Sequence, residues 1–293
     1  MMKDSIGNRI YQYVVTVLLI LLAAACILPF VNLLAISLSA SGPVMSGQVL
    51  FWPKEFTTEV YRMIIKNGTL LAAMRRTIIL TVVYVLSAMV MTILCAYPLS
   101  EPTLKGKNIF WPFILFTMYF SGGMIPGYLL VNALGLIDTY AALILPGILS
   151  TYNMIVMRSF FTSIPASLKE SAFIDGANDL DILLKIVLPL SKPVLATIAL
   201  FYAVARWNGI QDALLYINSP DMAVLQMKLK SMIESAEAVS DIMEGASAQN
   251  AQNVVSQTVR SGSLIFSIIP VLIVYPFLQK YFVKGVMIGA VKG

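Results

Sequence analysis

Six stretches of this sequence are apolar for long enough to cross a lipid bilayer as helices, and they limit the possible folds more than any other feature. A helix crosses the hydrocarbon with roughly 20 mainly apolar residues. Hydrophobic residues make up 58% of the chain and charged residues only 12%, a mix that cannot cover a soluble domain. The sequence therefore predicts an all-α integral membrane protein with six transmembrane helices. They are expected at residues 12–38, 74–99, 109–131, 139–161, 188–208 and 262–282.

The first apolar stretch has features of a cleaved leader. Lys3 and Arg9 precede it, and Ala23-Ala24-Ala25-Cys26 resembles a lipoprotein cleavage site. The apolar run nevertheless continues to about Leu38, beyond the short core of a cleaved signal. We therefore interpret it as a retained first span.

An even number of spans places both termini on one side of the membrane, together with the linkers 101–108 and 158–192. With the termini inside, the inner segments hold eleven of the twenty Lys and Arg residues, a weak bias in the direction of the positive-inside rule. The same rule accounts for the net charge of +5 without nucleic acid. Arg206 lies about 27 Å along the fifth span at 1.5 Å per residue. There we expect it to snorkel to the interface, next to Trp207.

Two outer connections, 39–70 and 209–261, separate the spans. The longer one contains Leu225, Leu229 and Met232 at helical spacing and continues as a polar tract rich in Ala, Gln, Asn and Ser. That tract fits either a disordered loop or an adaptable arm for an extracytoplasmic partner. The residues alone leave both interpretations open.

Several kinds of chemistry lack the residues they need. The chain has no histidine, and its two cysteines, Cys26 and Cys95, lie in apolar runs. Most transition-metal and haem sites and His-based acid–base catalysis therefore lack ligands. No paired carboxylates lie inside a span, which argues against an intramembrane enzyme. We expect no catalytic residue, no metal site and no cofactor bound by this chain.

Residues 163–190, between the fourth and fifth spans, form the densest cluster of charge and turn signals on the inner side. Pro165 suits a helix start, and Ser167 and Glu170 have the spacing of a capping box. Gly176 can adopt the left-handed conformation that ends a helix. The segment therefore predicts a short helix that ends in a glycine corner.

A second short helix should follow this corner, beginning at Asp179 or Asp181. On the first helix, Leu168, Ala172 and Phe173 fall on neighbouring parts of one face and predict a small apolar knob suited to a groove. An ordinary helical hairpin fits the same pattern, so both readings remain open at this point.

The spacing within this segment is specific. Glu170-Ser171-Ala172 is followed by Gly176 after three residues, by Ile186 after nine more, and then by Leu188-Pro189. This resembles the signature loop of bacterial ABC importer permeases, Glu-Ala-Ala, three residues, Gly, nine residues, Ile, one residue, Leu-Pro. Every spacing agrees, and the one departure is Ser171 in place of the usual Ala.

The resemblance extends over essentially the whole chain to the permeases of carbohydrate importers. The chain looks similar to the smaller maltose-type permease subunit and to permeases for alginate- or pectin-derived oligosaccharides. The segments that carry this likeness are Gly122–Leu130, Leu134–Thr139, Leu145-Pro146, Arg158–Phe161, and Lys192-Pro193 through Trp207-Asn208.

The resemblance implies a type I ABC importer permease fold with a cytoplasmic coupling helix, in the bacterial cytoplasmic (inner) membrane with both termini cytoplasmic. Residues 1–70 would hold the first helix and the outer connection, 71–283 the permease core with coupling segment 163–190, and 284–293 a cytoplasmic tail. The implied function is import of a carbohydrate by alternating access. The alternatives are a permease for another small solute or an ion-coupled secondary transporter, although the latter needs ionisable residues near the midplane.

The resemblance also implies partners in the membrane and on both sides of it. These are a second, homologous permease, two copies of a cytoplasmic ABC ATPase, and an extracytoplasmic solute-binding protein. The chain lacks a Gly-x-x-x-x-Gly-Lys-Ser/Thr loop, so ATP and Mg²⁺ would be used by the ATPase. The chain itself would be a transport subunit and not an enzyme.

Two sets of site residues follow. The residues assigned to ATPase coupling are Leu168, Glu170, Ser171, Ala172, Phe173, Asp175, Gly176, Ile186 and Pro189. For the substrate pathway, sugar recognition needs aromatic and directional polar groups, although packing between helices explains the same residues equally well. The candidates are Tyr84, Tyr119, Tyr152 and Asn153.

Overall fold

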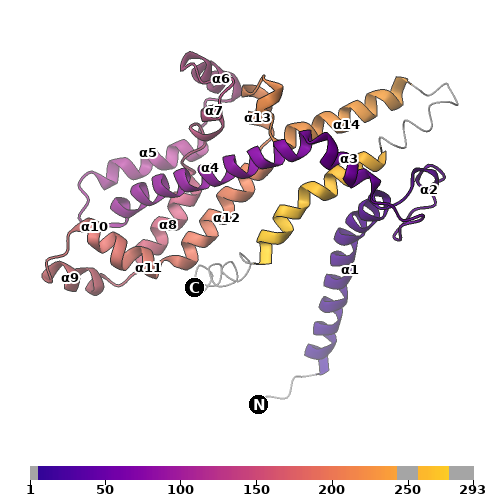
Figure 1. Cartoon of the computed structure of the whole chain (residues 1–293). Coiled ribbons are helices and arrows are strands. Elements are labelled where there is room, and N and C mark those ends of the chain that lie inside the picture. Colours follow the sequence, from indigo (N-terminus) through magenta and orange to yellow (C-terminus); the bar gives the residue numbers. More distant parts are fainter. Residues whose placement is uncertain (1–5, 243–256, 277–293) are drawn as a thin grey trace. The chain divides into compact units, whose positions relative to one another are not determined.

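The computed structural model describes residues 6–242 and 257–276 (Figure 1). Over these residues the chain is helical, and the only bridge between extended segments is an isolated antiparallel pair, Ser39 and Phe56. This confirms the all-α prediction. The chain divides into two compact units, Met1–Ala72 with Lys228–Ile269, and Ala73–Met227 with Pro270–Gly293.

The first unit begins with a long apolar helix and a compact connection. Helix α1 spans Ile6–Ser37, α2 spans Ser41–Met45, and α3 spans Glu59–Asn67. Helix α3 ends at Gly68, whose φ of +71° provides a left-handed cap. The unit also contains the first residues of α4 (Thr69–Ser100), most of α14 (Leu225–Ile242) and part of the helix Gln257–Pro276.

The second unit is a bundle built around α4, α5, α8 and α12, with short helices at its ends (Figure 1). Its core is formed where α8 packs against α12, and Met154, Met157, Phe161 and Ile198 are fully buried there. The elements of this unit that follow α4 are, in chain order, α5 (Lys107–Tyr119), α6 (Met124–Ala133), α7 (Ala141–Ile144), α8 (Thr151–Ser163), α9 (Ala166–Ile174), α10 (Asp179–Ile182), the π-helix η1 (Leu183–Val187), α11 (Leu188–Leu190), α12 (Lys192–Asn208), α13 (Gln211–Tyr216) and the 3₁₀ helix η2 (Pro220–Met222).

Three described helices are long and apolar enough to cross a membrane, namely Ile10–Ser37, Thr69–Ser100 and Gln257–Pro276. Two bent pairs raise this number to five if each pair is one span: Lys107–Tyr119 with Met124–Ala133, and Asp179–Leu190 with Lys192–Asn208. The last predicted window, 262–282, lies only partly within the described residues. The predicted polar tract after Leu225 and the predicted tail at 284–293 lie largely or wholly outside them.

Three predicted windows do not form continuous helices. Window 188–208 breaks at Ser191, where the segment Asp179–Leu190 meets α12 at 82°. Window 109–131 breaks between α5 and α6, which meet at 110°, because the chain turns at Gly123 with φ +87°. Window 139–161 contains the four-residue α7, a break at Pro146-Gly147, and then α8. The predicted boundaries were wrong here because hydropathy measures lipid solubility and is insensitive to single Gly and Pro residues that interrupt a helix.

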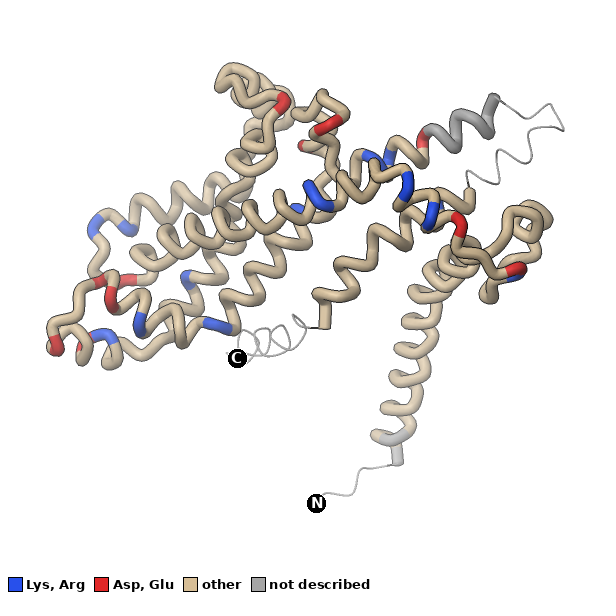
Figure 2. The backbone as a smooth tube through the Cα atoms, in the orientation of Figure 1, with Lys and Arg blue, Asp and Glu red and all other residues tan. Residues whose placement is uncertain are grey.

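The second unit has two distinct polar ends. At one end the predicted inner linkers meet, since Arg158 Nε donates to the Leu99 carbonyl at 2.8 Å and Lys169 pairs with Glu101. At the other end Arg76 donates to the Ala223 carbonyl at 2.9 Å. Figure 2 shows charged residues gathered at the end that carries α9 and α10. The linkers 101–108 and 158–192 therefore do share one end of the bundle, as predicted.

Candidate functional site

The candidate site is the element α9–α10–η1–α11 at the polar end that carries Lys169. Helix α9 begins directly after Pro165, whose ψ of 130° leads the chain into the helix. The predicted capping box is wrong, because no side chain caps this helix and Ser167 lies within its first turn. Ser171 instead bonds its hydroxyl to the Leu168 carbonyl at 3.2 Å, so the one departure from the family pattern is satisfied locally.

The glycine corner forms as predicted. Gly176 has φ +84°, and its N–H donates to the Phe173 carbonyl at 3.1 Å. The next N–H, of Ala177, donates to the Ala172 carbonyl at 2.9 Å. These two bonds make a Schellman motif. A Cβ at Gly176 would meet no atom within 4 Å, so the requirement for glycine comes from the backbone conformation alone.

Asn178 caps the following helix, where Asp179 or Asp181 was expected. The Asn178 Oδ1 atom accepts from the Asp181 N–H at 2.9 Å. The two aspartates occupy the first turn, where negative charge favours the helix dipole. The prediction missed Asn178 although asparagine is among the best N-cap residues.

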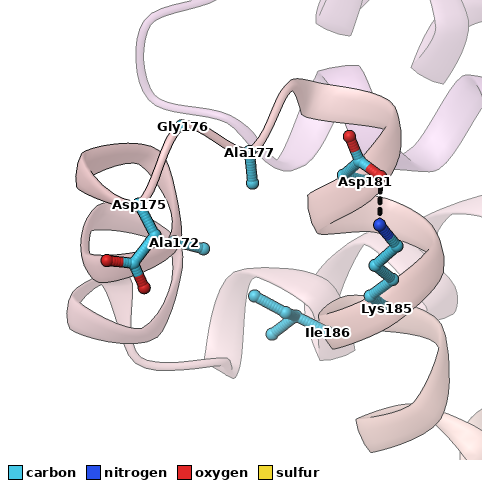
Figure 3. Close-up of a pocket in the computed structure, with 7 residues that line it drawn as sticks. All are labelled: Ala172, Asp175, Gly176, Ala177, Asp181, Lys185 and Ile186. Carbon is cyan, nitrogen blue, oxygen red and sulfur yellow. Dashed lines mark ion pairs between the residues drawn. The ribbon is translucent and has the colours of Figure 1, made fainter.

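A cavity of about 390 Å³ lies between α9 and the α10–η1 segment (Figure 3). Its lining is apolar at Ala172, Ala177 and Ile186 and charged at Asp175, Asp181 and Lys185. The Asp181 and Lys185 side chains pair at 2.6 Å, as the dashed line in Figure 3 marks. Four of the predicted coupling residues therefore line this cavity, namely Ala172, Asp175, Gly176 and Ile186.

The outward surface of α9 differs from the predicted knob. Leu168 and Phe173 are exposed, but Ala172 is partly buried and packs toward the core. Ile174, which was not among the predicted residues, is 87% exposed. Glu170 is also exposed and forms no ion pair within the described residues. The surface available to a partner is thus Leu168, Phe173 and Ile174 with one free carboxylate.

An ion pair fastens α9 to the end of α4. Lys169 Nζ lies 2.6 Å from Glu101 Oε1, and the two side chains are only 15% and 27% exposed. Lys107 Nζ donates to the Glu101 carbonyl at 3.2 Å. The Tyr97 hydroxyl donates to the Asp179 carbonyl at 3.3 Å. Because the contacts reach both α9 and α10, the candidate coupling element is tied directly to a long membrane helix.

Arg206 does not snorkel, contrary to the prediction. Its side chain is 5% exposed and forms a bidentate ion pair with Asp212, with Nη2 to Oδ1 at 3.0 Å. It also donates to the carbonyls of Leu143 at 2.9 Å and Gly209 at 3.1 Å. The partners come from α7, from the turn before α13 and from the first turn of α13 itself, which the linear distance along one helix could not reveal. A planar guanidinium can satisfy several acceptors at once.

The four substrate-pathway candidates divide into two pairs. Tyr84 is buried, donates to the Gly147 carbonyl at 2.7 Å and packs edge-on against Tyr202. Asn153 is buried in the first turn of α8. Tyr119 and Tyr152 are 76% and 54% exposed. The first pair is therefore engaged in packing, and only the second pair presents its rings at the surface.

The predictions missed a buried hydrogen-bond chain that positions α8. The Ser150 N–H donates to the Tyr202 hydroxyl at 3.0 Å, and this hydroxyl lies 2.7 Å from Thr92 Oγ1. Thr92 in turn donates to the Ala88 carbonyl at 2.7 Å. Tyr202 therefore donates to Thr92, and the chain runs from the start of α8 through α12 to α4. No local pattern marks residues that meet only after folding.

The comparisons with known proteins agree with this architecture. Residues 67–288 match the family described as binding-protein-dependent transport system inner membrane component. The polygalacturonan/rhamnogalacturonan transport system permease protein YtcP of Bacillus subtilis is 40% identical, over 98% of this chain and 99% of its own length. Protein LplC of the same organism is also 40% identical, over 100% and 98%.

A solved structure is similar along almost the whole chain. It is a crystal structure of a bacterial ABC transporter involved in the import of the acidic polysaccharide alginate, with a TM-score of 0.86 and 34% identity. The match covers 96% of this chain and 100% of the other. The chain therefore belongs to the family of binding-protein-dependent transport system inner membrane components.

Proposed function

We propose that this chain is a permease subunit of an ATP-binding-cassette importer that carries an oligosaccharide of acidic sugars, such as a pectin- or alginate-derived fragment, into the cytoplasm. The names of the YtcP relative and of the solved structure support this substrate class, since the first concerns polygalacturonan and rhamnogalacturonan and the second the acidic polysaccharide alginate. The observation that carries the proposal is the outward surface of α9. It presents Leu168, Phe173, Ile174 and an unpaired Glu170 on an element fastened to membrane helices.

This surface suits docking in a groove of a cytoplasmic ATPase. Leu168, Phe173 and Ile174 would supply apolar contacts, and Glu170 would pair with a basic side chain of the ATPase. Gly176 and its neighbour Asp175 fix the corner that orients α9. Ala172 and Ile186 line the cavity behind α9 (Figure 3). Ser171 lies within α9, and Pro189 lies in the short helix α11 that follows η1.

The proposed assembly contains a second, homologous permease, two ATPase copies and an extracytoplasmic solute-binding protein. ATP and Mg²⁺ would act at the ATPases, so this chain would bind no cofactor and catalyse no reaction. Residues 158–192 and both termini would face the cytoplasm. Tyr119 and Tyr152 remain the pathway candidates, because their rings are exposed whereas Tyr84 and Asn153 are buried.

Force would enter the permease at two places. Beyond the Gly176 corner, α9 is followed by the segment α10–η1–α11, which meets α12 at 82°. Helix α9 is also fastened to the end of α4 by the Lys169–Glu101 pair. ATP binds the closed form of the ATPases more tightly, and this differential affinity would shift the permeases from inward-open to outward-open. Because both connections lead to long helices, a movement of α9 would rotate the bundle and not merely a loop.

The test is uptake by the purified importer in proteoliposomes, with ATP inside and the binding protein and a labelled galacturonate oligomer outside. We expect uptake that needs ATP and continues after ionophores collapse the proton and sodium gradients. Uptake driven by a gradient without ATP would instead support the secondary transporter. Failure with galacturonate but uptake of another sugar would overturn the substrate class alone.

The role of Glu170 is tested in the same vesicles. Truncating one partner of a desolvated interface pair costs about 2–5 kcal/mol, so Glu170→Ala should reduce ATP hydrolysis stimulated by the loaded binding protein. Lys185→Ala is the matched control, because Lys185 is exposed on the same element and pairs within its own helical segment. Normal coupled hydrolysis by Glu170→Ala would remove the proposed role.

A further inference from the structure

The connection after α1 is fastened into a defined shape. Ser39 and Phe56 form an antiparallel bridge, and the Thr57 N–H donates to the Leu38 carbonyl at 2.9 Å. Ser39 is buried, with its hydroxyl donating to the Ala35 carbonyl at 2.7 Å and accepting from the Lys54 N–H at 3.0 Å. The base of the loop between these residues is therefore closed on the end of α1.

The loop also folds back along α1. Asn32 Nδ2 donates to the Leu50 carbonyl at 2.6 Å. Val44 and Val49 are buried in one cluster with Ala35 and Ile36 of the helix. Asn32 lies five residues before Ser37, the last residue of α1, which is about 7.5 Å along the helix axis. Leu50 is thus held beside the span, well below the end of the helix.

This height corresponds to the boundary between headgroups and hydrocarbon. The apolar part of α1, Ile10–Ser37, has 28 residues and so extends about 42 Å. The hydrocarbon is about 30 Å thick, so a centred α1 would project about 6 Å beyond it at each end. The carbonyl of Leu50, about 7.5 Å below the end of the helix, would then lie close to the edge of the hydrocarbon.

The side chains at this height are large, apolar and directed away from the protein. Leu50 is 65% exposed, Phe51 46% and Trp52 83%. The sequence holds no charged residue between Arg9 and Lys54, so the uncharged surface of α1 continues without interruption onto the loop and ends where Lys54 can reach the headgroups. Tryptophan is enriched at such interfaces because its ring is apolar and its N–H is polar.

We propose that the segment Leu50–Trp52 is a membrane anchor that inserts into the phospholipid interface beside the C-terminal end of α1. The segment would fix the height and tilt of the first span, as interfacial aromatic residues do. The phospholipid interface is favoured over a protein partner because the segment is continuous with the exposed surface of a membrane span and is held at the height of the interface.

Spin-label accessibility tests this in the assembled importer, reconstituted into phosphatidylcholine–phosphatidylglycerol liposomes. The label is placed at Trp52→Cys in a background lacking Cys26 and Cys95. Matched labels at Leu21→Cys, in the middle of α1, and at Glu59→Cys, on the exposed first turn of α3, provide the lipid and water references. We expect the Trp52 label to be more accessible to oxygen and less accessible to a water-soluble nickel complex than the Glu59 label.

Two outcomes of the spin-label measurement would overturn the proposal. Nickel accessibility equal to that at Glu59 would place the loop in water, and low accessibility to both reagents would show that another protein, such as the second permease, covers it. Quenching by phosphatidylcholine brominated near the glycerol end of its acyl chains gives an independent measurement. Among the three tryptophans of this chain, Trp52 should give the largest share of the lipid-quenched emission. The conservative variant Trp52→Phe should therefore lose this share, and an unchanged quenched share would also contradict insertion.

Discussion

The ion pair between Lys169 and Glu101 should hold α9 against the end of α4, and its strength can be worked out from its geometry. Exposed ion pairs contribute about 0.2–1 kcal/mol, and hydrogen bonds to charged groups about 1.5–3 kcal/mol when they are shielded. With a 2.6 Å separation and exposures of 15% and 27%, this pair belongs in the second class. We expect a coupling energy of about 1.5–2.5 kcal/mol.

Hydrogen exchange of the α9 amides measures this energy directly, because α9 exchanges through local opening. Lys169→Met keeps the aliphatic stem and removes the charge, and Glu101→Gln keeps the shape and removes the charge. Each should speed exchange across α9 by about 10- to 70-fold, since about 1.4 kcal/mol corresponds to a factor of ten. The double variant should show no further increase, because the interaction is already lost.

The pair Asp181–Lys185 offers a matched control on the same element. It is a contact at i, i+4 on the surface, so Lys185→Met should change exchange by about twofold at most. The charge-reversed double variant Lys169→Glu with Glu101→Lys should regain part of the protection that either single reversal loses. Equal exchange in Lys169→Met and Lys185→Met, or no recovery on reversal, would refute the role of this pair.

Three further predictions concern the corner, the buried arginine and the loop that contains Asp138. Gly176→Ala should destabilise the α9 corner by about 1–2 kcal/mol, the cost of the left-handed conformation for a residue with a Cβ, seen as faster exchange at the end of α9. Arg206→Lys should lower the thermal stability of the importer, because one ammonium cannot replace the bidentate contact with Asp212. The Asp138 carboxylate accepts from the Ser219 hydroxyl and two backbone N–H groups, which lowers its pKa below 3.8. The stability that the charged carboxylate gives this loop is therefore complete above that value and is lost as the pH falls through the lower folded pKa. Hydrogen exchange of the loop amides at acidic pH would measure this loss.

Each of these has an outcome that contradicts it. An unchanged corner in Gly176→Ala would mean that the backbone relaxes out of the left-handed region. A stable Arg206→Lys importer would show that the carbonyl contacts alone suffice. If Asp138→Asn gives the same acid profile as the parent, then the carboxylate does not cause the loss of protection in this loop.

The candidate coupling element was the most predictable part of the chain because its signals are local. A proline before α9 and a glycine after it act within one helical turn, so Pro165 and Gly176 mark the ends in the sequence itself. The identity of the next cap was harder to predict, because Asn178 and the two aspartates nearby can all serve. The orientation of Ala172 depended on the neighbouring α10, which the helical period of α9 alone does not include.

The sequence by itself determined that the solvent of this protein is lipid, that its elements are helices, and that one polar element with a glycine corner interrupts them. Those conclusions rest on hydropathy and on backbone preferences, which act over a few residues or one span. Only the tertiary structure decided where the charges go. Arg206 contacts the Leu143 carbonyl, 63 residues away, as well as the nearby Asp212, and Lys169 pairs with Glu101, 68 residues away. A buried charge needs such partners, and only the folded chain brings the distant ones together.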